Sequence, residues 1–123
     1  MIMQHASQAY AAVAKETASP RELEASLLLK AAAKLQAVHD KWDDNSSNLD
    51  EAVRYNRRLW TVFIDAVLQD DSALPMAVRQ NLANLGLFVM GETFSLMTNP
   101  LPKNLISLIN INREVAAGLR GNG

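Results

Sequence analysis

Apolar side chains recur every three or four residues along most of this chain, and that helical period is the feature that most constrains the fold. No segment alternates apolar and polar residues between turn residues, as a half-buried strand would, and no internal repeat is present. The pattern predicts an all-α helical bundle with four main helices plus a short N-terminal helix. A length of 123 residues fits a single domain spanning 1–123.

Capping and breaking residues set the expected helix boundaries. Ser19-Pro20-Arg21-Glu22 is typical of a capping box with proline at the first helical position. Asn99-Pro100-Leu101-Pro102 is a strong stop between two apolar stretches. We expect a short helix at 7–15, then helices at 20–42, 49–69 with Ser47 as a weak cap, from Pro75 to the Asn99 stop, and 103–119.

Each main helix carries an apolar stripe that should face the core. The expected core residues are Leu23, Leu27, Leu28, Ala31, Leu35, Val38, Trp42, Leu49, Val53, Asn56, Trp60, Phe63, Val67, Val78, Leu82, Leu85, Val89, Leu96, Leu105, Leu108, Ile109, Asn112, Val115 and Leu119. The last three helices have apolar arcs wider than one interface requires. Either they stack on each other, or a groove remains for a partner. Gly86 and Gly91 suggest close approach of a neighbouring helix.

Composition excludes several kinds of function. With 12 Lys+Arg against 13 Asp+Glu, the formal charge of -1 argues against a general nucleic-acid binder. There are no cysteines and only two histidines, so there is little material for a metal site. Nucleotide-binding, hydrolase and metalloprotease motifs are absent, and we expect no enzyme activity and no cofactor. We expect a cytoplasmic protein, because no segment resembles a membrane span or a secretory signal.

The densest local cluster is Asn56-Arg57-Arg58-Leu59-Trp60. In the structural interpretation, Trp60 fills the core while Arg57 and Arg58 pair with Glu51 or Asp65 at helical spacing. The alternatives are an arginine–aromatic hot spot for a protein partner, or RNA contact through the arginines, which the near-neutral charge does not favour.

Buried amides and adaptable apolar side chains complete the set of candidate residues. Asn56 lies within an apolar stripe, where a buried amide can fix the register of the helices at some cost in stability. For Asn110 and Asn112, of which Asn112 also lies on an apolar stripe, hydrogen bonding between helices is favoured over ligand binding. Methionines beside broad apolar arcs can line a groove that accepts an amphipathic helix. The candidate partner-binding residues are Asn56, Arg57, Arg58, Trp60, Phe88, Met90 and Asn112; no catalytic, cofactor-binding or metal-binding residue is predicted.

The chain resembles the FlaF family, the flagellar biosynthesis regulators of α-proteobacteria. The resemblance is carried by short motifs in a fixed order along nearly the whole chain: Ala9-Tyr10, Ser19-Pro20-Arg21, Leu23-Glu24, Asn56-Arg57-Arg58-Leu59-Trp60, Leu74-Pro75, Val78-Arg79, Asn81-Leu82, Phe88-Val89, Leu108-Ile109, Ile111-Asn112-Arg113 and Gly118-Leu119. The loop at 43–48 and the C-terminal tail have no counterpart in the pattern.

The resemblance implies a non-enzymatic factor that binds flagellin in a chaperone-like way and promotes its synthesis and secretion during filament assembly. Flagellin would be held through its amphipathic terminal helices, and a second regulator, FlbT, is a further expected partner. Two alternatives stay open. One is a post-transcriptional regulator of flagellin messenger RNA acting with FlbT, in its direct form through Arg54, Arg57 and Arg58. The other is a self-associating helical scaffold.

Overall fold

The computed structural model of the chain describes residues 20–42, 46–69 and 74–121. It contains four helices in these ranges: α2 (Pro20–Asp40), α3 (Ser46–Val67), α4 (Met76–Thr98) and α5 (Pro102–Leu119). The predicted all-α bundle of four main helices is therefore confirmed. The short helix expected at 7–15 lies outside the described residues, as does Ser19 of the expected capping box.

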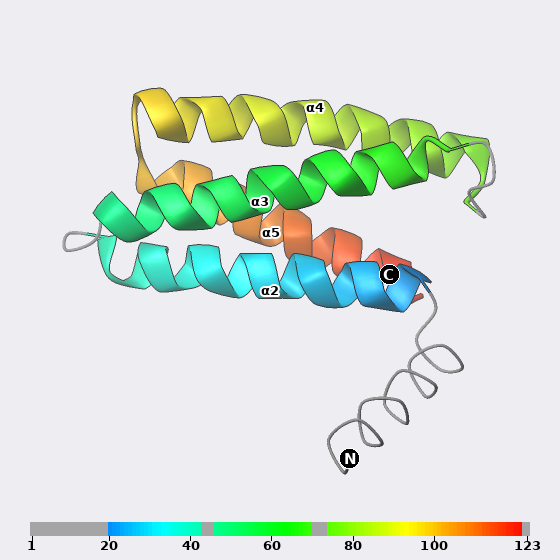
Figure 1. Cartoon of the computed structure of the whole chain (residues 1–123), viewed down its shortest axis with the longest axis horizontal. Coiled ribbons are helices and arrows are strands. Elements are labelled where there is room, and N and C mark those ends of the chain that lie inside the picture. Colours follow the sequence, from blue (N-terminus) through cyan, green and yellow to red (C-terminus); the bar gives the residue numbers. More distant parts are fainter. Residues whose placement is uncertain (1–19, 43–45, 70–73, 122–123) are drawn as a thin grey trace, which may run out of the picture.

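The four helices alternate in direction and form a closed ring in the order α2, α3, α4, α5 (Figure 1). Each helix packs on its neighbours in the chain, and α5 closes the ring by packing on α2. Short connections favour this arrangement, because a short loop can join consecutive helices only when they lie side by side and antiparallel. The α3–α4 edge consequently lies across the bundle from the α2–α5 edge.

Helix boundaries differ from the expected ones by a few residues. α3 begins at Ser46, so Ser47 lies inside the helix and the predicted cap there is wrong. α5 begins at Pro102, one residue early, because the fixed φ of proline suits the first helical position. Pro75 precedes α4 with an extended ψ of 151° and is not helical itself. Past the end of α5, Gly121 takes a φ of 78°, which glycine adopts without strain.

Small side chains bring α2 and α5 close together. Ala25 and Ala32 on α2 and Ala116 on α5 are almost completely buried in the core cluster. At the N-terminal end of α2, Arg120 Nε donates to Glu22 Oε1 at 2.9 Å and ties the end of α5 to the start of α2. This pair of helices is therefore the most extensive packing unit of the bundle.

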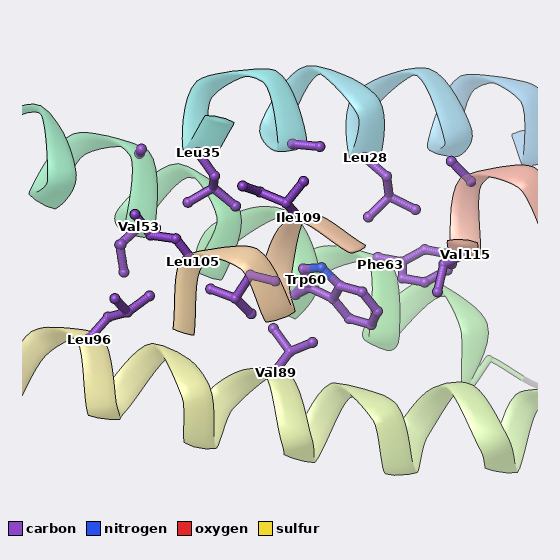
Figure 2. Packing of buried hydrophobic residues seen from close by; sticks show 14 of the residues in the cluster. Leu28, Leu35, Val53, Trp60, Phe63, Val89, Leu96, Leu105, Ile109 and Val115 are labelled. Atoms are coloured by element: carbon purple, nitrogen blue, oxygen red, sulfur yellow. The ribbon is translucent and has the colours of Figure 1, made fainter. Parts of the chain in front are cut away.

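The predicted stripes are buried along most of their length. Figure 2 shows Trp60 and Phe63 between the side chains of α2 and those of α4. Their rings meet edge to face, with centroids 5.4 Å apart. The predictions for Leu23 and Val78 are wrong, because these side chains are 58% and 40% exposed near the ends of their helices.

A buried amide joins three of the four helices. Asn112 Oδ1 on α5 accepts from Trp60 Nε1 at 2.9 Å, while its Nδ2 donates to Asn56 Oδ1 at 2.7 Å and to the Leu28 carbonyl at 3.3 Å. Asn56, Trp60 and Asn112 are all 0% exposed. The hydrogen bonding between helices that the sequence favoured is therefore confirmed for Asn112, whereas Asn110 is exposed on the outer side of α5 and the prediction is wrong there.

Gly86 marks the closest approach between α3 and α4. A Cβ added there would lie 2.8 Å from Ile64 Cγ1, whereas one added at Gly91 would meet nothing within 4 Å. The close approach predicted from the two glycines is therefore confirmed for Gly86 and wrong for Gly91.

The two glycines form a matched pair for a stability test. We expect Gly91→Ala to raise the free energy of unfolding by about 0.5–1 kcal/mol, because alanine is the better helix former. Gly86→Ala should lower it by about 1 kcal/mol or more, because the added methyl overpacks against Ile64 and that cost exceeds the propensity gain. Urea unfolding followed by circular dichroism measures both, and stabilisation by Gly86→Ala would contradict the packing.

A second pair of substitutions tests the amide. Asn112→Ala leaves the buried Trp60 N–H and Asn56 Oδ1 without their partner, so we expect a loss of about 3 kcal/mol in the free energy of unfolding. Asn110→Ala, on the exposed side of the same helix, should change it by less than about 0.5 kcal/mol. Equal effects of the two substitutions in urea unfolding would show that the amide does not stabilise the bundle.

Candidate functional site

The structure separates the predicted partner-binding residues into two groups. Asn56, Trp60 and Asn112 have no exposed surface, so a partner docking on the closed bundle contacts none of them. Arg57 and Arg58 are exposed on α3. On α4, Phe88 is 50% exposed and Met90 is half-buried against the core. Only this second group is placed where it can touch another protein.

A row of large apolar side chains runs along the edge of α4 that faces α3; we call it the α4 stripe. It consists of Leu87, Met90, Phe94 and Met97, of which Leu87 is 74% exposed, Phe94 67% and Met97 50%. Their spacing of three, four and three residues keeps them on one side of the helix. The sequence showed only that the apolar arc of α4 is broad. The buried positions of the same helix, from Leu82 to Leu96, repeat at the same spacing of three and four residues, so spacing alone could not separate the exposed stripe from the core.

The neighbouring flank of α3 is basic. Arg54, Arg57, Arg58 and Met97 together line a hollow of about 380 Å³. Met97 also forms part of the wall of a second hollow, of about 240 Å³, at the end of the same edge. The α4 stripe therefore ends against a cluster of three arginines.

Two of these arginines have guanidinium groups without a partner among the described residues. Arg54 Nε lies 3.0 Å from Asp50 Oδ2. The guanidinium groups of Arg57 and Arg58 form no ion pair or hydrogen bond with any residue that the structure describes, so the pairing expected with Glu51 or Asp65 is wrong. The Glu51 carboxylate instead lies 4.0 Å from Lys34 Nζ on α2. Arg57 and Arg58 can thus bind an external carboxylate without first breaking an internal pair.

A further hollow of about 470 Å³ opens between α2 and α3, and it shares Arg54 and Arg58 with the 380 Å³ hollow. Its apolar walls are Leu27, Leu59 and Val62. The Tyr55 ring in this hollow already has Lys34 Nζ 4.9 Å from its centroid and Lys30 Nζ 5.9 Å away. These cation–π contacts within the chain compete with any ligand for the aromatic face.

The acidic and histidine side chains do not converge on a reaction centre. Glu24 is partly buried, and its Oε1 lies 2.9 Å from Arg21 Nε. Burial raises the pKa of the Glu24 carboxyl, and the charge of Arg21 opposes that shift. His39 Nδ1 lies 3.7 Å from Asp40 Oδ1. Among residues 20–42, 46–69 and 74–121, no group of three His, Cys, Asp or Glu could hold a metal ion.

None of the described helices is long and apolar enough to cross a membrane.

A family of known proteins matches most of this chain. Neither a curated protein nor a solved structure is similar enough to match this chain. The family model described as flagellar protein FlaF matches residues 6–119. Since that match includes all four described helices and nearly the full sequence, the chain belongs to the FlaF family of flagellar proteins.

Proposed function

We propose that this flagellar protein is a non-enzymatic, cytoplasmic factor that binds flagellin in a chaperone-like way and promotes its synthesis and secretion. The observation that carries the proposal is the exposure of large apolar side chains along α4. The most exposed of them there are Leu87, Phe94 and Met76, at 74%, 67% and 67%. They belong to a protein whose family is flagellar.

Such a concentration of exposed apolar side chains favours a protein partner. Large exposed apolar patches on soluble proteins commonly mark interaction sites, because leaving them in water costs free energy that docking recovers. An unassembled flagellin would present amphipathic terminal helices that tend to associate with each other. The apolar face of such a helix can pack along the elongated apolar surface of α4. Docking of a flagellin helix on α4 therefore suits the surfaces of both proteins.

Regulation of flagellin messenger RNA with FlbT is the second candidate function. The observation that favours it is that Arg57 and Arg58 are exposed and that their guanidinium groups have no partner within the described part of the chain. Direct RNA binding normally draws on a wider basic field than a chain of net charge -1 provides. An effect on translation that passes through a protein partner needs no such field. We therefore rank flagellin binding first.

Calorimetry with purified flagellin monomer tests the proposal. We expect the full chain to bind at micromolar concentrations and to slow the pelleting of flagellin as filaments. Phe94→Ser should weaken binding by about tenfold, because it removes an exposed aromatic from the contact surface.

Leu23→Ser is the matched control, since Leu23 is 58% exposed but lies on α2. It should leave the affinity within about twofold. Circular dichroism checks that both variants fold. Absence of binding heat together with unchanged flagellin pelleting would refute the proposal, and a salt-sensitive shift of flagellin leader RNA by the same protein would favour the second candidate.

A further inference from the structure

We infer that the groove between α3 and α4 binds one amphipathic helix of a partner protein, whose apolar residues follow a 3.5-residue period and whose flank facing α3 carries carboxylates. This inference rests on the proposed function and deepens it. It names the surface, the secondary structure of the bound segment and the charge that the segment must present.

Contacts at three levels fix the α3–α4 edge. At one end, Arg79 Nη1 donates to the Gln69 carbonyl at 3.1 Å. In the middle, Gly86 lets α4 approach the Ile64 side chain of α3. At the other end, Met97 lies against the arginines of α3. The two helices are thus in contact near one end and at the middle of the edge, and they line a common hollow near the other end.

The apolar wall of the groove is the α4 stripe. Its side chains fall at positions 87, 90, 94 and 97, which is the spacing of one side of a coiled-coil seam. A helix lying along this row can place its own apolar residues between them every three or four positions. Two of the four are methionines, whose flexible side chains adapt to partners of different shape.

The charged wall is the arginine cluster of α3. None of the four described residues that line the 380 Å³ hollow is acidic. Asp50, in the wall of the 240 Å³ hollow, pairs with Arg54, and Glu51 lies 4.0 Å from Lys34 Nζ, so neither carboxylate pairs with Arg57 or Arg58. A guanidinium binds a carboxylate through two parallel N–H donors, which a lysine cannot do. A docked helix would also exclude water beside Met97 and strengthen this attraction. We therefore expect the bound helix to carry carboxylates on the flank that faces Arg57 and Arg58.

Two synthetic helical peptides with identical apolar positions provide the probe. One carries Glu and the other Lys at the positions that flank the apolar stripe. Fluorescence anisotropy with the full chain should show the Glu peptide binding about tenfold more tightly at low salt, with the difference shrinking as salt is added. The double variant Arg57→Glu/Arg58→Glu should reverse the preference.

Arg113→Glu is the matched control. Arg113 is an exposed arginine on α5, where it donates to Gln36 Oε1 at 3.3 Å, and its reversal should leave the peptide preference unchanged. All substituted side chains are exposed, and circular dichroism confirms that the variants are folded. Equal affinity for the two peptides, or a preference that the double variant retains, overturns the inference.

The remaining outcomes separate this inference from the proposed function. If wild-type protein binds flagellin and the double variant binds it equally well, the acidic helix is not recognised here, although flagellin binding stands. If the peptide preference holds but flagellin is not bound, the groove is supported and the proposed function fails. Two results would assign the groove to another occupant. If the protein self-associates in analytical ultracentrifugation and Phe94→Ser abolishes this, the occupant is a second copy of the chain. If leader RNA competes with the Glu peptide, the occupant is RNA.

Discussion

The hydrogen bonds of Asn112 constrain the rest of this structure more than any other interaction. One side chain satisfies the indole of Trp60, the amide oxygen of Asn56 and a carbonyl of α2, all inside the core. Apolar packing tolerates small rotations of a helix, but an unsatisfied buried polar group costs about 1–3 kcal/mol. The register of α2, α3 and α5 is therefore specified by polar geometry, while the surrounding apolar side chains supply most of the stabilisation.

This network does not include α4, and that difference separates the bundle into two parts. α4 is held by apolar contacts of Val89 and Leu96 and by its close approach to α3 at Gly86. A polar link to α5 is the bond from Asn104 Nδ2 to Glu92 Oε2, at 2.8 Å. Because α4 does not share the buried amide, its remaining surface can be devoted to exposed apolar side chains without disturbing the register of the other three helices.

The sequence predicted the helices and most of the core, because both depend on local periodicity. The row from Leu49 to Val67 on α3 is an example in which every predicted position is buried. Prediction failed where burial depends on what lies across from a residue. Leu23 and Val78 fall on the periodic pattern near the N-terminal ends of α2 and α4, yet their side chains are exposed. The identity of Asn112 as the partner of Trp60 also required the fold, since 52 residues separate the two.

The cluster at 56–60 shows how one short motif serves two purposes at once. Successive residues of a helix project about 100° apart, so a five-residue segment must face both inward and outward. Asn56 and Trp60, four residues apart, point into the amide network, while Arg57 and Arg58 between them are directed to solvent beside the α4 stripe. The buried pair fixes the rotation of α3, and that rotation sets the direction in which the two arginines point. The buried Asn112 amide thus determines the direction of two arginines that it does not contact. For this reason the buried residues Asn56 and Trp60 and the exposed residues Arg57 and Arg58 belong to one site, although a partner can contact only the arginines.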